Sequence, residues 1–155
     1  MTKFLPDTLF SNIIEHAPLI SIDLCIVHQD KILLGKRINP PAKDYYFTPG
    51  GRIYKNEPWK DAMKRIAKEE LSLDIKVSSW ELMGMWDHFY KDSVMNENIS
   101  THYVNMPYYS EFSNLPALSI DSQHSELSWF DLSICKNNNW IHPYTQNYIQ
   151  WILKR

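Results

Sequence analysis

The chain has 155 residues, of which 44% are apolar and 22% charged, so it is long enough for a domain with a substantial core and does not belong to the disordered class. Its net charge of −2 excludes a general attraction to nucleic acid or to an anionic membrane, so an anionic ligand has to be held by individual arginines. No apolar run resembles a secretory signal or a membrane span, and the two cysteines match no metal or redox spacing, so we expect a cytoplasmic protein with reduced thiols.

The first forty residues predict a helix followed by a hairpin. Residues 7–16 have helical character, and apolar residues then alternate with others through residues 19–27, which is the period of a strand. A second strand begins at residues 32–35 and ends at Arg37. Asp23 lies in the middle of the first strand, where its side chain either faces solvent or forms the floor of a site.

The remaining segments complete a mixed architecture. Polar or proline-containing stretches predict loops over residues 39–45, 91–100 and 113–125. Strands are predicted over residues 75–90, as one long bent strand or two short ones, over 101–112 and over 126–132, and a closing aromatic amphipathic helix over 143–155. Since no repeat or linker interrupts the chain, we expect a single domain, residues 1–155, of the α/β (α+β) class, with helices flanking a mixed sheet.

The most informative stretch is residues 47–73, in which a strand end and a glycine pair precede a helix. Glu57 and Pro58 suit the start of this helix, because proline fits the first turn and an acid favours its positive end. At helical spacing, one apolar stripe contains Trp59, Ala62, Met63, Ile66 and Ala67, and the opposite side carries Lys60, Lys64 and Lys68.

Glu70 breaks this pattern, because its azimuth falls inside the apolar stripe. A carboxylate on a core-facing stripe is costly unless a cation meets it, so Glu70 forms a buried salt bridge, swings out at a frayed end, or binds a metal. The neighbouring residues favour the metal. Gly50 and Gly51 allow a close backbone approach, and Arg52 and Arg65 suit bidentate capture of phosphate oxygens. Together these features indicate magnesium and a phosphorylated substrate.

This stretch resembles the Nudix box, whose usual pattern is G-x5-E-x7-R-E-U-x-E-E-x-G-U, with U a bulky aliphatic residue. The residues in register are Gly51, Glu57, Arg65, Glu69, Glu70 and Leu73. Three positions depart from the pattern: Ile66 replaces the glutamate after the arginine, Ala67 is small for an aliphatic position, and Ser72 replaces the last glycine. The departure at Ile66 removes a carboxylate that ordinary members use for metal binding or catalysis, so it argues against ordinary Nudix phosphate chemistry.

Motifs outside the box make the chain similar to the GDP-mannose mannosyl hydrolase branch of the Nudix superfamily. In order they are Ser21-Ile22-Asp23, Leu34-Gly35-Lys36-Arg37, Phe47-Thr48-Pro49-Gly50-Gly51-Arg52, Trp86-Asp87-His88-Phe89-Tyr90, Thr101-His102-Tyr103-Val104 and Gln123-His124. That branch also carries an aliphatic residue at the place of Ile66, whereas Glu69 is less typical of it. The resemblance implies a Nudix-like mixed sheet sandwiched between helices, a GDP-sugar as substrate, and a homodimer.

The resemblance also implies the roles of individual residues. Mg²⁺ is expected to be held by the Gly50 carbonyl, the Glu70 carboxylate and Gln123, with diphosphate oxygens and water completing its shell. The groups expected to meet the diphosphate or the sugar are Arg37, Arg52 and Arg65 as cations, Tyr103 as a hydrogen-bond donor, and Asp23 as a ligand of sugar hydroxyls or an orienting group.

His124 is the expected general base. It lies in a polar loop next to Gln123, and histidine has the side-chain pKa closest to neutrality, so it can take a proton from water near pH 7. A loop histidine alone is usually a surface residue, and it is the adjacent metal ligand and the resemblance that favour catalysis. His88, expected beside the sugar, is the second candidate.

Three functions compete. The first is magnesium-dependent hydrolysis of GDP-mannose or GDP-glucose to GDP and free hexose, with water attacking the anomeric carbon and inverting it, as in inverting glycoside hydrolysis. The second is pyrophosphatase chemistry on a nucleoside diphosphate sugar, which Ile66 disfavours and Glu69 slightly favours. The third is a non-catalytic nucleotide-sugar binding module, which the presence of both His124 and Glu70 disfavours.

Overall fold

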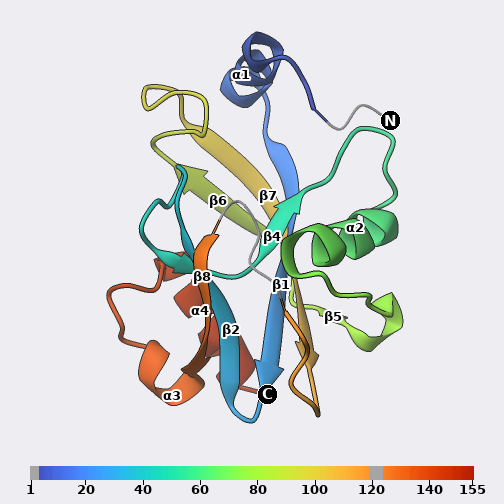
Figure 1. Ribbon diagram of the computed structural model, residues 1–155. Helices are drawn as coiled ribbons and strands as arrows, with labels where there is room; N and C mark the ends of the chain where they lie inside the picture. Colours follow the sequence, from blue (N-terminus) through green and yellow to red (C-terminus); the bar gives the residue numbers. More distant parts are fainter. Residues whose placement is uncertain (1–3, 119–123) are drawn as a thin grey trace.

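The computed structural model describes residues 4–118 and 124–155, with the backbone alone at residues 124 and 125 (Figure 1). The helices are α1 (Asp7–His16), α2 (Trp59–Leu71), α3 (Leu132–Cys135) and α4 (Pro143–Leu153), with a 3-10 turn at Val77–Ser79. The strands are β1 (Leu19–His28), β2 (Lys31–Arg37), β3 (Tyr46–Phe47), β4 (Gly50–Arg52), β5 (Glu81–Leu82), β6 (Trp86–Tyr90), β7 (Thr101–Glu111) and β8 (His124–Asp131). Within the described ranges, no helix is both long and apolar enough to cross a membrane.

The described strands form one mixed sheet with β1 at its centre. Strand β1 runs parallel to β7 along most of its length, and on its other side it pairs antiparallel with two different strands. At its end it pairs with β2 through Val27 and Ile32, whereas nearer its start it pairs with β4, with Asp23 opposite Gly50. The outer pairs are β8 and β3 on β2, and β5 and β6 on β7. This arrangement places the middle of β1 beside the glycine pair.

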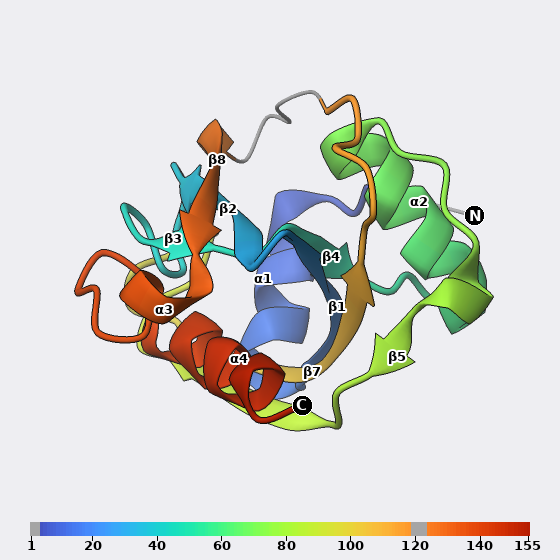
Figure 2. The same cartoon turned by 90° about the horizontal axis from the view of Figure 1, so that it is seen from below.

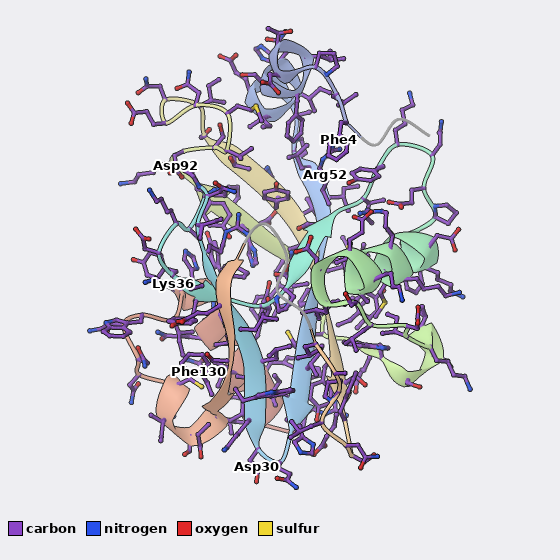
Figure 3. All side chains as sticks on the ribbon, in the orientation of Figure 1. Phe4, Asp30, Lys36, Arg52, Asp92 and Phe130 are labelled. Carbon is purple, nitrogen blue, oxygen red and sulfur yellow. The ribbon has the colours of Figure 1, made fainter. Side chains whose placement is uncertain are left out.

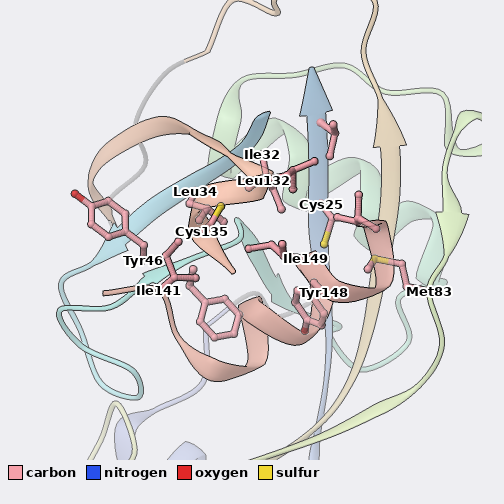
Figure 4. Close-up of a cluster of buried hydrophobic side chains, with 13 residues drawn as sticks. Cys25, Ile32, Leu34, Tyr46, Met83, Leu132, Cys135, Ile141, Tyr148 and Ile149 are labelled. Atoms are coloured by element: carbon pink, nitrogen blue, oxygen red, sulfur yellow. The ribbon is translucent and has the colours of Figure 1, made fainter. Parts of the chain in front are cut away.

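Helices cover both faces of the sheet, and each face has its own core. Figure 2 shows the sheet from below, with α2 on one side of it and α4 on the other. Because side chains of β1 alternate between the faces, Ile22, Leu24 and Ile26 are buried toward α2, whereas Cys25 and Val27 are buried toward α4. Figure 4 shows the second of these cores, in which Tyr148 and Ile149 of α4 pack against the sheet. The predicted mixed sheet between helices is confirmed.

Helix α2 follows its predicted pattern except at its start. Ala62, Met63, Ile66 and Ala67 are all buried, and the three lysines of the opposite side are exposed. Trp59 was predicted in the apolar stripe and this is wrong, since it is 40% exposed and stacks on the ring of Tyr108 with centroids 5.6 Å apart. Trp59 therefore contacts the sheet at Tyr108 of β7 through one face of its ring while the rest of the side chain meets solvent.

The structure corrects several predicted boundaries. The glycine pair is not only a turn but the strand β4, and residues 75–80 contain a 3-10 turn where a strand was expected. Strand β8 begins at residue 124, within the expected loop, and α3 was not predicted. These elements have two to four residues or begin in polar sequence, so they contain too few turns or alternations to show a period.

Candidate functional site

A cavity of about 540 Å³ is lined by residues of α1, α2, β1, β2, β3, β4, β6 and β7 and of the loops beside them. Figure 3 shows two lining residues, Phe4 and Arg52, at the α1 end of the molecule. The predicted site residues that line the cavity are Asp23, Arg37, Gly50, Arg52, Arg65, Glu70, His88 and Tyr103. A volume of this size suits a ligand as large as a nucleotide sugar.

The two remaining predicted residues, Gln123 and His124, are neighbours at the start of β8. Gln123 lies outside the described residues. His124 is the first residue of β8, and its backbone is in register with Arg37, which lines the cavity. The structure thus brings the backbone of the predicted base next to the cavity, and the role of its imidazole stays a prediction.

Gly50 and Asp23 are packed so closely that residue 50 has to be glycine. A Cβ at residue 50 would lie 2.2 Å from Oδ1 of Asp23 and 2.6 Å from the carbonyl oxygen of Ile22. Asp23 is itself buried, with 6% of its surface exposed. The alternative in which Asp23 faces solvent is therefore wrong, and its carboxyl group forms part of the cavity floor.

A buried polar network holds Asp23. The hydroxyl of Tyr148 donates to its Oδ2 at 2.7 Å. Burial raises the pKa of Asp23 to about 6, while the hydrogen bonds of Tyr148 and Asn105 and the charge of Arg37 act in the opposite direction. Neither Tyr148 nor Asn105 was predicted as a site residue. Asn105 could have been predicted from the sequence, because it lies two residues after Tyr103 in one strand and therefore on the same face of the sheet.

The guanidinium of Arg65 is hydrogen-bonded to other groups of the protein. Its Nε donates to Glu57 at 2.6 Å, and Nη2 donates to the same carboxylate at 2.9 Å and to the carbonyl oxygen of Arg52 at 2.8 Å. Its Nη1 donates to Glu69 at 3.2 Å. These contacts use four of the five N–H donors of the guanidinium, so at most one remains for a ligand, and the expected contact of Arg65 with the diphosphate stays a prediction. Arg65 fixes the main chain that presents Arg52.

The other two arginines and Tyr103 suit the binding of an anion. The guanidinium of Arg52 lies over the rings of Phe10 and Tyr54, 4.6 and 4.8 Å from their centroids. Arg37 is oriented by the bond from its Nε to the carbonyl oxygen of Pro41 at 2.9 Å. Burial raises the pKa of Tyr103, so its phenol stays protonated and can donate a hydrogen bond.

Glu70 keeps an unsatisfied carboxylate oxygen. Its Oε2 is buried, and no hydrogen-bond donor of the described residues reaches it. The nearby acids Glu57 and Glu69 differ, since both pair with Arg65. A buried anionic oxygen without a protein partner, beside the glycine pair in the cavity wall, fits a magnesium ion, which takes few protein ligands and completes its shell with substrate oxygens and water. The described residues contain no group of three or more His, Cys, Asp and Glu that could enclose a metal.

Ile66 occupies the place of a further acid and is not part of the cavity. It is 1% exposed in the core beneath α2, and its Cγ1 would be 3.2 Å from a Cβ at residue 51. The described part of α2 therefore presents its acids toward the cavity only at Glu69 and Glu70.

His88 is enclosed by aromatic side chains at the back of the cavity. It is 2% exposed, its ring stacks on Tyr144 with centroids 4.0 Å apart, and its Nε2 is 3.2 Å from the hydroxyl of Tyr148. Burial and the nearby His142 lower the pKa of His88 to about 4. The imidazole is therefore neutral near pH 7, which suits hydrogen bonding more than proton uptake.

Comparisons with known proteins agree with this geometry. The family model described as NUDIX domain matches residues 19–152. The low-salt glycan biosynthesis protein Agl8 of Haloferax volcanii is 36% identical over 148 residues, which are 96% of this chain and 90% of that protein. The ADP-ribose pyrophosphatase of Methanocaldococcus jannaschii is 39% identical over 69 residues, 44% of this chain and 40% of that one. The MutT NUDIX hydrolase of Burkholderia pseudomallei shares the fold, with a TM-score of 0.73, 22% identity, and coverage of 88% of this chain and 99% of that chain.

Proposed function

The chain belongs to the NUDIX domain family and is a Nudix hydrolase, and from this premise we propose that it hydrolyses GDP-mannose or GDP-glucose to GDP and free hexose. The observation that carries the proposal is the burial of Ile66 beneath Gly51. Because that position offers no carboxylate, α2 supplies few acids to activate water near phosphorus. Attack of water at the sugar carbon needs fewer acidic groups at the metal site, since an already ionised diphosphate is a good leaving group.

The residues proposed to hold Mg²⁺ are Glu70, through its unsatisfied Oε2, the carbonyl of Gly50, and Gln123 by resemblance. When bound there, the ion would supply charge stabilisation for the departing diphosphate. Arg37 and Arg52 line the same cavity and would bind the diphosphate oxygens. The protonated phenol of Tyr103 would donate a further hydrogen bond to them.

Asp23 and His124 are proposed to act at the sugar. Asp23 would accept hydrogen bonds from sugar hydroxyls, a role supported by its place on the cavity floor. His124 would remove a proton from the attacking water on the side opposite the diphosphate, which gives inversion at the anomeric carbon. His88, neutral and enclosed, would contact the sugar as a hydrogen-bonding group rather than act as the base.

The substrate class has support from the relatives. A protein named for glycan biosynthesis is similar over nearly the whole chain, which fits a substrate that carries a sugar. The second candidate, cleavage of the P–O–P bridge of a nucleoside diphosphate compound, is favoured by the similarity to a protein named ADP-ribose pyrophosphatase and by Glu69, a second acid of α2 at the cavity. The non-catalytic binding module is the third.

Hydrolysis in ¹⁸O-labelled water distinguishes these functions. The purified protein is incubated with Mg²⁺ and GDP-mannose or GDP-glucose, and products are identified by mass spectrometry and by NMR of the first-formed sugar. We expect the label on the hexose, none on GDP, and a β anomer from the α-linked substrate. Label on phosphate, with GMP and hexose 1-phosphate as products, would establish the pyrophosphatase. Binding of both nucleotide sugars without turnover would favour the third function, a non-catalytic binding module.

We also propose that the protein is a homodimer, a proposal that rests on the resemblance. Light scattering during gel filtration tests it, with a mass near twice the 18.4 kDa of one chain as the expected result.

A further inference from the structure

The C-terminal helix α4 contacts the site through the buried hydroxyl of Tyr148. Tyr148 is fully buried, and its hydroxyl oxygen lies 2.7 Å from Oδ2 of Asp23, 3.0 Å from Oδ1 of Asn105 and 3.2 Å from Nε2 of His88. Two of these partners, Asp23 and His88, are residues proposed to contact the sugar. A hydroxyl shared by three polar groups from β1, β6 and β7 fixes their relative positions.

Counting protons assigns each partner its role. A tyrosine hydroxyl has one proton, and Oδ2 of Asp23 and Oδ1 of Asn105 both lie within hydrogen-bond distance as acceptors, so the proton serves these two oxygens in a three-centre arrangement. Nε2 of His88 then has to be the donor to the phenol oxygen, which selects the Nε2–H tautomer of the neutral ring. Asn105 is itself held, since its Nδ2 donates to Oγ of Ser21 at 2.7 Å.

A second tyrosine of α4 holds the strand that carries His88. The ring of Tyr144 stacks on the imidazole with an interplanar angle of 2°. Its hydroxyl accepts from the backbone N–H of Phe89 at 2.9 Å and donates to the carbonyl oxygen of the same residue at 3.0 Å. Helix α4 therefore restrains both the backbone and the ring at this point of β6.

We infer that Tyr148 is a positioning residue of the site, which holds the Asp23 carboxylate toward the cavity and holds His88 in its Nε2–H tautomer. The inference rests on the proposed function, in which Asp23 acts on the sugar. It differs from a purely structural role, in which the hydroxyl only satisfies buried polar groups and its loss changes stability without a specific effect on turnover.

A double-mutant cycle in turnover tests this coupling. We expect Tyr148→Phe to lower kcat by roughly 10- to 100-fold with little change in KM, because a misplaced carboxylate loses alignment rather than the diphosphate contacts. In an Asp23→Asn background, Tyr148→Phe should lower kcat by less than about threefold, since the aligned carboxylate is already gone. Additive losses would overturn the inference.

The matched control is Tyr46→Phe. Tyr46 is also a buried tyrosine whose hydroxyl donates to a carboxylate, that of Glu126, and it does not line the cavity. Its loss should combine additively with Asp23→Asn. Thermal melts of all variants are recorded, and the cycle is measured below the lowest melting temperature so that every variant is folded.

A spectroscopic measurement separates this inference from the proposed function. ¹⁵N–¹H NMR of histidine-labelled protein reports the tautomer of each ring without any substrate. We expect His88 to be the Nε2–H tautomer in the wild type. In Tyr148→Phe the tautomer population of His88 should change, and in Tyr46→Phe the His88 signals should stay as in the wild type. An unaltered His88 signal in Tyr148→Phe would reject the positioning role even if the enzyme hydrolyses nucleotide sugars. If no nucleotide sugar is hydrolysed, the proposed function fails and the tautomer still decides the inference.

Discussion

Ile66 fills the space directly beneath Gly51: a Cβ added to the glycine would lie 3.2 Å from Cγ1 of the isoleucine. The neighbouring Gly50 meets a different surface, because its added Cβ would lie 2.2 Å from the Asp23 carboxylate and 2.6 Å from a backbone oxygen. A Cβ at residue 51 would thus meet only side-chain atoms among its nearest neighbours, whereas a Cβ at residue 50 would meet a site residue and the main chain.

This difference predicts unequal effects of alanine at the two positions. Gly50→Ala should displace Asp23 or strand β1 and reduce kcat by more than about 100-fold, since misplacement near 1 Å is enough for such a loss. Gly51→Ala brings its Cβ to 3.2 Å from Cγ1 of Ile66, a contact that a shift of a few tenths of an ångström relieves, so it should cost about 1 kcal/mol of stability and less than tenfold in kcat. Activity assays with thermal melts compare them, and equal losses would contradict the assignment.

Glu70→Gln should keep the fold and weaken the binding of Mg²⁺. The reason is that Oε2 of Glu70 is buried and has no donor among the described residues, so its charge has no protein partner to lose. We expect turnover to fall by more than about 100-fold and to need higher magnesium for half-saturation. Isothermal titration with MgCl₂ and the magnesium dependence of kcat measure this.

Glu69→Ala is the control for Glu70→Gln. Glu69 directly precedes Glu70 in the chain but is partly exposed and pairs with Arg65. Its removal should change magnesium dependence much less. An unchanged magnesium dependence in Glu70→Gln would remove Glu70 from the ligand set, and a large change in Glu69→Ala would favour the pyrophosphatase.

The parts of the site that lie within one periodic segment were predictable. The stripe of α2 singled out Glu70 because a carboxylate appeared at an apolar azimuth, and the alternation of β1 limited Asp23 to one face. The network around Asp23 was not predictable, because Tyr148 is 125 residues away and meets it only through the sheet and α4. The hydrogen bond from Arg65 to the Arg52 carbonyl was not predictable either, because it joins α2 to the main chain of β4 and only the folded structure brings the two together.

His124→Ala should lower kcat by roughly 10² to 10⁴, the usual contribution of a general base, with a much smaller change in substrate affinity. Steady-state kinetics and binding of GDP measure the two effects. His88→Ala is the informative comparison, because His88 is buried beside Tyr148 and is proposed to contact the sugar without acting as the base. A crippled His88→Ala together with a nearly normal His124→Ala would show that the base is the other histidine.

Arg65→Lys should destabilise the junction of α2 and β4. Lysine cannot reproduce the paired bonds to Glu57 and the bond to the Arg52 carbonyl, so we expect the free energy of unfolding to fall by about 1–3 kcal/mol. Urea denaturation measures the change. Lys68→Ala removes an ion pair to Asp74 whose side chains are 59% and 89% exposed, so it should change stability by less than about 0.5 kcal/mol.

The folded protein should lose stability in mild acid because His88 is buried in its neutral form. The pKa of His88 in the folded protein is about 4, below the ordinary 6.5, so the unfolded chain binds more protons between these values. The stability contributed by the neutral ring is therefore complete above pH 6.5 and is lost as pH falls through this window. Between pH 7.5 and 5, the free energy of unfolding should fall by about 2 kcal/mol on account of His88.

His88→Gln separates this contribution from those of other groups. Urea denaturation at pH 7.5 and 5 should show a smaller loss in the variant than in the wild type, by about 2 kcal/mol. The loss should not vanish, because burial also lowers the pKa of His142 to about 4, and that residue remains. An equal loss in His88→Gln and the wild type would mean that His88 accepts a proton in the fold as readily as in the unfolded chain, which its enclosure by Tyr144 and Tyr148 opposes.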